Sequence, residues 1–250
     1  MKQLLNKFLP DFVRKQLVYQ KYKEHNIALH KISIKNMHVV NISCQNYARY
    51  EFLKKTVKNS FGKVLKVENY SFYFHPIAII KKPNNIEEYL KFIGAKSRNM
   101  NKKAQKNGIV CREFFWNNHL DDIYAIHKSS DKRQGREMDK AYKEYPKEIV
   151  SIREEDFYIT YMGAFKDDKL IGYVELYVYG NFIMINRILG HKNYLNLGIM
   201  NILIKHCVLY IIDNDIKYLS YLAMQNRKNN SLSAFKYRVG FRENSLLELK

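Results

Sequence analysis

The clearest pattern of apolar and polar positions lies between Tyr161 and Met200, where three apolar, β-rich runs follow one another. Polar turns separate them, and tight turns between such runs predict an antiparallel meander. The runs cover residues 161–165, 170–179 and 182–189. After a polar loop, Gly198 opens an apolar run with helical spacing. The unpaired amides at the start of such a helix would form an anion cradle.

The chain between Pro83 and the meander alternates helical and strand-like patterns. Asn84 or Asn85 would cap a helix from Ile86 that continues, with a break near Gly94, to Asn107. Gly108 would end it, and residues 109–115 would form a strand. Asn117 or Asn118 would then cap a helix with four residues on one face: Leu120, Ile123, Tyr124 and His127. A histidine on such a face is usually a buried core residue.

After the meander, the pattern predicts a strand over 218–224, a helix through Arg238 and a last strand over 245–249. Residues 1–30 read as one or two basic amphipathic helices interrupted at Pro10. They would pack on the domain or lie on a membrane surface. Residues 27–42 and 64–80 favour strands, and 47–58 a helix. We expect two parts: a basic helical and strand-rich subdomain, 1–83, and a second domain, 84–250.

This order of elements resembles the core of the GNAT acyltransferases over roughly residues 96–250. In that family the last meander strand splays from its neighbour, and the following loop and helix hold the pyrophosphate of coenzyme A. The loop signature is Gln/Arg-x-x-Gly-x-Gly/Ala; Leu195, Gly198 and Met200 fill its positions, so one glycine matches. The resemblance implies an α+β fold, a mixed, mostly antiparallel sheet flanked by helices, with an N-terminal helix and strand extension.

The resemblance also implies a site. Acyl-CoA, with acetyl-CoA the first expectation, would be the co-substrate, and no metal is expected. The residues in the corresponding positions are Ile188, Leu189, Asn196, Leu197, Gly198, Ile199 and Met200. Where many GNAT enzymes carry a tyrosine acid, four residues before the final glycine, this chain has Lys236. Tyr237 is adjacent but out of that register.

Two features are instead similar to the Fem-type aminoacyl transferases, which take their donor from tRNA. One is the Phe235-Lys236 pair. The other is the stretch from Lys96 to Gly108, which contains five cations and no acid and precedes a strand. Fem enzymes usually carry two GNAT-like domains, whereas this chain has room for one domain and a reduced N-terminal part.

Acyl transfer to an amine requires removal of a proton and stabilisation of an oxyanion. Glu175 lies among apolar residues in a predicted strand, where many GNAT enzymes carry their base; an outward-facing strand glutamate is the alternative. Lys236 would stabilise negative charge or be a surface cation. Arg133 and Arg136 flank Gly135 in a loop suited to a phosphate or carboxylate of the acceptor. The chain contains no Walker loop, paired-cysteine metal motif or nucleophile elbow.

The formal net charge is +19, from 43 Lys and Arg against 24 Asp and Glu. This excess favours an anionic partner: tRNA, a phosphate-rich substrate or a membrane surface. A compositional bias toward lysine is the alternative explanation. The three cysteines are widely spaced, which indicates a reducing compartment. We expect no transmembrane segment and no secretory signal, and therefore a cytoplasmic protein or one peripheral at the inner face of the membrane.

Three functions remain open. The first is an acyltransferase that moves an acyl group from acyl-CoA to an amine, or a hydroxyl, of a small or cell-envelope precursor substrate. The second is an aminoacyl-tRNA-dependent transferase of the Fem type. The third is a non-catalytic nucleic-acid-binding protein on a GNAT-like scaffold. The strand, loop and helix at Gly198 place the acyl-CoA function first.

Overall fold

The computed structural model describes residues 39–42, 44–46, 48–49, 51–53, 64–67, 70–73, 77–133, 136–223, 231–244 and 246–249. The helices predicted within residues 1–30 lie outside this part of the chain. Among the described residues, no helix is long and apolar enough to cross a membrane.

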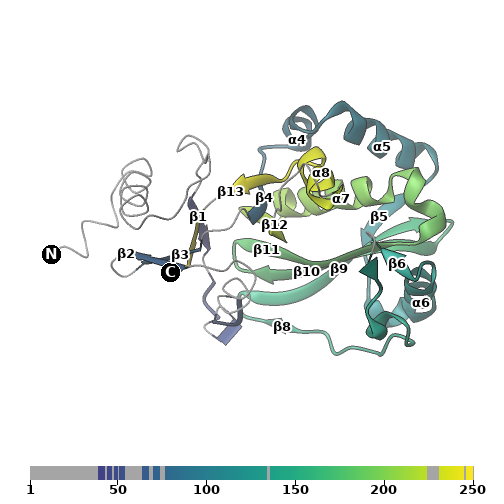
Figure 1. The fold of residues 1–250 in the computed structure, drawn as a ribbon, viewed down its shortest axis with the longest axis horizontal. Helices are drawn as coiled ribbons and strands as arrows, with labels where there is room; N and C mark the ends of the chain where they lie inside the picture. Colours follow the sequence, from purple (N-terminus) through teal and green to yellow (C-terminus); the bar gives the residue numbers. More distant parts are fainter. Residues whose placement is uncertain are drawn as a thin grey trace.

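An eight-stranded mixed sheet forms the centre of the molecule (Figure 1). Seven strands follow the order β13-β4-β12-β11-β10-β9-β5, and β8 pairs with β9 beside β5. Every pairing in this sheet is antiparallel except that of β11 with β12. The predicted meander is confirmed as β9, β10 and β11. The bounds are β4 Ile77–Lys81, β5 Val110–Glu113, β8 Arg153–Glu154, β9 Phe157–Lys166, β10 Lys169–Tyr179, β11 Phe182–Gly190, β12 Tyr218–Ala223 and β13 Arg242–Asn244.

Helices cover both faces of this sheet (Figure 1). On one face lie α4 (Ile86–Phe92), α5 (Ala95–Lys106), α7 (Ile199–Asp213) and α8 (Ser231–Arg238). On the other lies α6 (Leu120–Lys128). Residues alternate between the two faces along a strand. Val174, Leu176 and Val178 of β10 therefore join the apolar core under α7, whereas Tyr173 joins the core under α6. The α+β fold class expected from the sequence is confirmed.

The helix boundaries follow the local signals in one place and depart from them in another. Asn85 caps α4 by accepting from the amide of Glu88 at 2.9 Å, and Gly108, with φ +71°, follows α5. The cap expected at Asn117 or Asn118 is wrong, because α6 begins at Leu120 after a 3₁₀ helix (η3, Trp116–His119). Asn117 instead bonds both the amide and the carbonyl of Ile149. A partner distant in sequence has replaced the local capping bond.

A second, four-stranded sheet has the order β1-β14-β3-β2. Its strands are β1 (Val39–Ile42), β2 (Val64–Val67), β3 (Tyr70–Tyr73) and β14 (Leu246–Leu249). Both sheets combine strands from the two sides of Pro83, because β4 belongs to the large sheet and β14 to the small one. The division into domains 1–83 and 84–250 stays a prediction. A short hairpin, β6 (Lys132–Arg133) and β7 (Arg136–Glu137), follows α6.

The pairing of β11 with β12 is short. It joins Phe182, Ile183 and Met184 to Tyr218, Leu219 and Ser220, although β11 continues to Gly190. On its other side β11 stays paired with β10 along its length, with an irregularity opposite Glu175. Beyond Met184 the ladder between β11 and β12 therefore ends inside the sheet.

Candidate active site

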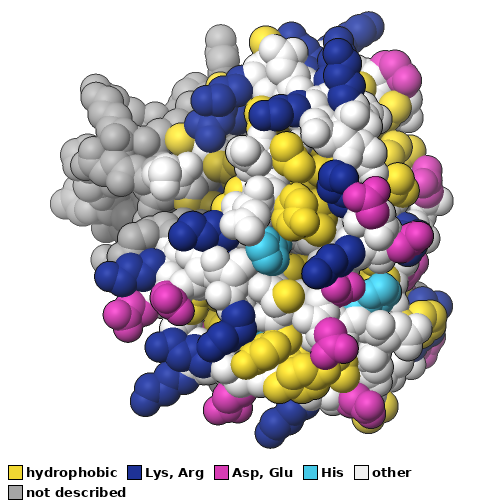
Figure 2. Space-filling model, turned by 90° about the vertical axis from the view of Figure 1, so that its right-hand side faces the viewer, with side chains coloured by type: hydrophobic (Ala, Val, Ile, Leu, Met, Phe, Trp, Pro, Cys, Tyr) yellow, Lys and Arg dark blue, Asp and Glu magenta, His cyan; other side chains and the backbone are white. Residues whose placement is uncertain are grey.

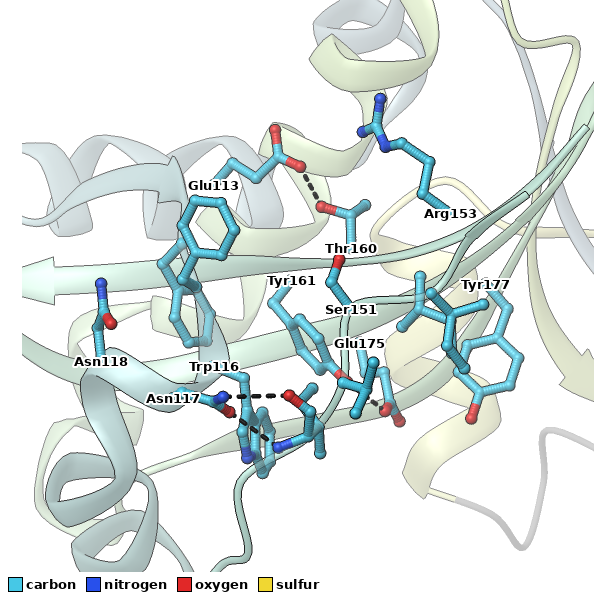
Figure 3. Close-up of a pocket in the computed structure, with 16 residues that line it drawn as sticks. Glu113, Trp116, Asn117, Asn118, Ser151, Arg153, Thr160, Tyr161, Glu175 and Tyr177 are labelled. Carbon is cyan, nitrogen blue, oxygen red and sulfur yellow. Dashed lines mark hydrogen bonds between the residues drawn. The ribbon is translucent and has the colours of Figure 1, made fainter. Parts of the chain in front are cut away.

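A cavity of about 820 Å³ opens at the β9 side of the large sheet. Its walls come from the segment after β5, the segment that leads into β8, and the strands β9 and β10 (Figure 3). The rings of Trp116, Tyr161 and Tyr177 line it, and two carboxylates, Glu113 and Glu175, reach it. This size and mixture of aromatic and polar groups are typical of a small-molecule site.

The cavity wall is held by bonds between segments far apart in the sequence. Trp116 donates its indole N–H to the carbonyl of Lys147 at 3.1 Å, and the Asn117–Ile149 pair ties the same two segments together. The rings of Trp116 and Tyr161 pack with centroids 5.0 Å apart. The aromatic wall is therefore fixed by both hydrogen bonds and packing.

Glu175 is buried on β10, 4% exposed, and its carboxylate accepts three hydrogen bonds. Tyr161, its cross-strand neighbour, donates its hydroxyl at 3.0 Å (Figure 3). Arg187 donates Nε at 2.6 Å and Asn186 donates its side-chain amide at 2.5 Å. Burial and Glu175 raise the pKa of Tyr161. Burial is the largest influence on Arg187 and opposes its charge, but Glu175, Tyr173 and Tyr142 together raise the pKa of Arg187.

His127 on α6 is 5% exposed and contacts Tyr173, which lies two residues before Glu175 on β10. Its Nε2 lies 2.7 Å from the hydroxyl of Tyr173. Burial, followed by the charges of Arg187 and Arg133, lowers the pKa of His127 to about 4, so its ring is neutral at physiological pH. The expectation of a buried core histidine is met by this position.

The two arginines predicted to bind an acceptor anion lie in the β6–β7 hairpin. Arg133 and Arg136 are paired across it, and Arg133 donates to the carbonyl of Ile126 near the end of α6 at 3.1 Å. Burial lowers the pKa of Arg133. Arg133 does not line the cavity beside Glu175, and the role of both arginines in acceptor binding stays a prediction.

Lys236 on α8 is 3% exposed and contacts β12 where that strand leaves β11. Its Nζ donates to the carbonyl of Tyr221 at 2.5 Å and lies 4.1 Å from the centre of the Tyr221 ring. Burial lowers the pKa of Lys236 to about 8. Tyr237, the next residue, is 36% exposed and its ring lies 4.0 Å under the Arg242 guanidinium. Of the two, only Lys236 is buried beside β12.

The loop expected to hold a pyrophosphate is a 3₁₀ helix, η5 (Lys192–Leu197), followed by Gly198 and α7. Gly198 has φ +88° and is buried, and a Cβ placed on it would lie 2.4 Å from the carbonyl oxygen of Met100 on α5. Ile199 is also buried, while Asn196 is exposed and Leu197 and Met200 are half-buried. The backbone of α5 fills the space on the side of Gly198 where a side chain would point, and the binding of a pyrophosphate by these residues stays a prediction.

Sequence reasoning missed Tyr161, Trp116, Asn186 and Arg187. The tight turn after Lys166 brings Tyr161 near Glu175, but its register alone would pair Tyr161 with Val174. The extra residue Ile171 on β10 shifts the register by one, so that Tyr161 faces Glu175. Trp116 reaches the cavity only through the packing of η3 on the sheet. No local pattern in the sequence indicates that contact.

Residues 120–241 match the family model described as Acetyltransferase (GNAT) family. The solved structure of FemX is similar, with a TM-score of 0.53 and 11% identity over 80% of this chain and 68% of FemX. At that identity the likeness shows the fold alone. No curated protein sequence matches the chain significantly.

Two further structures are less similar. The C-terminal domain (DUF2156) of a putative lysylphosphatidylglycerol synthetase from Agrobacterium fabrum has a TM-score of 0.42 and 12% identity, over 78% of this chain and 64% of its own. A functionally unknown conserved protein from Staphylococcus epidermidis ATCC 12228 has a TM-score of 0.43 and 11% identity, over 90% of this chain and 94% of its own. The chain thus spans less than two thirds of the first of these.

Proposed function

Given that this chain carries a transferase domain of the GNAT-fold acyltransferase superfamily, we propose that it moves an aminoacyl group from tRNA to an amine held in the cavity beside Glu175. The shared fold supports acyl or aminoacyl transfer in general. The choice of donor and the place of the acceptor are the proposal, and each rests on its own observation.

The closed loop at Gly198 carries the choice of donor. A helix N-terminus binds a pyrophosphate through amides that face solvent. Here Gly198 and Ile199 are buried, and the Met100 carbonyl oxygen lies against Gly198. The amide of Gly198 also donates to the carbonyl of Leu195 at 3.3 Å, so it is already engaged within the loop. Coenzyme A, the donor ranked first from the sequence, would therefore lose the contacts that usually anchor it.

The charge distribution supports a polyanionic donor. The exposed lysines Lys102, Lys103 and Lys106 lie along the C-terminal half of α5, in a chain with a net charge of +19. In Figure 2, Lys and Arg side chains lie at the top of the face, the side on which α5 lies in Figure 1, and also along its lower left. Such a surface binds phosphates with a steep salt dependence. Arg98 serves the fold instead, since it donates to the last carbonyls of α4.

The reaction would join the acceptor nitrogen to the ester carbonyl carbon of the aminoacyl-tRNA and break the ester C–O bond. The proton lost by the amine ends on the 3′ oxygen of the leaving tRNA or on solvent. Lys236 is the residue proposed to face the developing oxyanion, because its buried Nζ lies where β11 and β12 separate. A cation in a poorly hydrated site stabilises such charge strongly.

The acceptor is proposed to be an amine of a small or cell-envelope precursor molecule. The cavity has the volume of a drug-sized ligand, and Trp116, Tyr161 and Tyr177 offer ring faces to its body. A tRNA donor would place the reaction in the cytoplasm. The domain responsible would be residues 84–250, as predicted from the sequence.

A specific observation favours a second candidate, an acyl-CoA-dependent N-acyltransferase. The ladder between β11 and β12 ends at Met184, so Ile188 and Leu189 lie beyond it. In the GNAT family this separation of strands admits the acyl arm of coenzyme A. Donor binding would then rest on β11 rather than on the loop at Gly198.

A comparison of donors tests the proposal. Labelled aminoacyl-tRNA and labelled acetyl-CoA would each be incubated with the protein and an extract of amine-bearing envelope precursors, with and without ribonuclease. We expect transfer from tRNA that ribonuclease abolishes. Transfer from acetyl-CoA that survives ribonuclease, with none from tRNA, would replace this function by the second candidate.

The lysines of α5 supply a matched pair of variants. Replacing Lys102, Lys103 and Lys106 with Gln should weaken tRNA binding and flatten its salt dependence. Replacing the exposed Lys140, Lys143 and Lys147 near η4 (Lys140–Tyr142) removes the same charge elsewhere. Equal losses in the two triple variants would mean that net charge, and not the α5 surface, attracts the RNA.

A further inference from the structure

The ladder between β10 and β11 contains one irregularity. Glu175 faces Arg187, and Leu176 faces Ile185, so Asn186 is an extra residue on β11. A strand with such a bulge bends and twists more strongly at that point. This bulge begins directly after Met184 and Ile185, where the pairing of β11 with β12 has just ended.

Both residues at the bulge are bonded to one carboxylate. Glu175 Oε2 accepts from Asn186 Nδ2 at 2.5 Å and from Arg187 Nε at 2.6 Å. Its other oxygen, Oε1, accepts from Tyr161 on β9 at 3.0 Å. One buried side chain on β10 therefore connects the strand before it and the bulged strand after it. Charge-assisted bonds of this kind are among the strongest that side chains make.

The same bonds limit what else Glu175 can do. An ionised carboxylate has about four acceptor positions, and protein donors occupy three of them. With 4% of its surface exposed, the remaining position has little access to a substrate proton. An acceptor amine in the cavity would have to compete with a guanidinium that is already bound.

We infer that Glu175 is a positioning residue, which pins the β11 bulge and so sets the separation of β11 from β12, and that it is not the general base expected from its place in the sequence. The strand that it holds includes Ile188 and Leu189, the part of β11 beyond the ladder with β12. The relevance of Glu175 to transfer rests on the proposed function, because the separated strands would receive the acyl group. The effect of Glu175 on the backbone of β11 is independent of that function.

Amide hydrogen exchange on the whole chain tests the structural half without any substrate. Glu175→Gln loses the charge that holds Arg187. Amide hydrogen exchange at residues 186–189 should therefore accelerate at least about fivefold, a factor that corresponds to the loss of a modest contact energy. Tyr177→Phe, which alters a neighbouring cavity residue outside these three bonds, is the control and should leave that exchange unchanged. Unchanged exchange in Glu175→Gln would overturn the inference.

A double variant tests the half that concerns transfer. Glu175→Gln and Arg187→Gln should each reduce transfer, but the two amides together can hydrogen-bond to each other. The double variant should therefore recover at least about fivefold of the rate lost in Glu175→Gln, with a pH–rate profile of unchanged shape. A general base cannot be restored by a second amide. If the losses of rate in the two single variants multiply in the double variant, and the pH–rate profile of Glu175→Gln lacks one of its limbs, Glu175 acts as the general base instead.

Failure of the proposed function would leave a distinct signature. If neither donor supports transfer, the exchange measurement still reports whether Glu175 holds the bulge. If transfer from aminoacyl-tRNA occurs and exchange is unaffected in Glu175→Gln, the donor proposal stands and the positioning role of Glu175 is wrong.

Discussion

Replacement of Lys236 with Met should make the protein more stable and less active. Met keeps the length of the side chain and removes its charge from a position that is 3% exposed. Burial lowers the pKa of Lys236 from its ordinary 10.5 to about 8. A buried cation whose pKa is strongly shifted and that lowers stability is a candidate for function.

The magnitude follows from those two pKa values. At about 1.36 kcal/mol per pKa unit, their difference corresponds to about 3 kcal/mol of unfavourable burial while the amine stays charged. Loss of the bond to the Tyr221 carbonyl and of the contact with its ring offsets about half of that. We therefore expect the free energy of unfolding at pH 7 to rise by about 1 to 2 kcal/mol in Lys236→Met.

The same two pKa values determine how the stability difference between the two proteins changes with pH. Below about pH 8 the lysine is protonated in both states, so the full penalty is present. Between about pH 8 and 10.5 the folded protein releases the proton before the unfolded chain does, and the contribution of this lysine to stability rises with pH. The advantage of the Met variant should shrink across that window.

Urea unfolding of both proteins at pH 7 and pH 9.5 measures the effect, with Lys143→Met, at an exposed position after η4, as the matched control. Transfer from the donor should fall in Lys236→Met and persist in Lys143→Met. A Met variant that is less stable at pH 7, or a stability difference that does not change with pH, would refute the reasoning. So would full transfer activity in Lys236→Met.

Three further predictions concern other parts of the site. Gly198→Ala should lower the free energy of unfolding by about 1 to 3 kcal/mol, because its Cβ would meet the Met100 carbonyl at a φ of +88°; a urea midpoint equal to that of the parent contradicts this packing. The His127 ring should titrate near pH 4 by NMR, and stability should fall as pH drops from about 6.5 toward 4, because the unfolded chain takes up the proton first; a ring midpoint near 6.5 would show that it is not desolvated. Trp116→Ala should raise the KM for the acceptor about tenfold, a loss of about 1.4 kcal/mol, and leave donor binding unchanged; an unchanged KM would place the acceptor outside this cavity.

The sequence by itself determined those parts of the fold that depend on neighbouring residues. Alternating apolar runs and tight turns specify β9, β10 and β11, since the side-chain period of a strand and the turn length are local properties. The Asn85 cap and the glycine after α5 are local in the same sense. The pairing of Tyr161 with Glu175 does not follow from turn length alone, because the extra residue Ile171 on β10 shifts the register by one.

Only the tertiary structure decided what these residues contact. Gly198 occupies the glycine position of the predicted pyrophosphate loop, yet the backbone of α5 lies against it. Asn117 has the sequence of a helix cap, yet it bonds Ile149 across the cavity wall. Glu175 has the position of a base, yet Tyr161, Asn186 and Arg187 hold its carboxylate. Side chains with several possible partners bond the one that packing brings within reach, and packing depends on residues far apart in the chain.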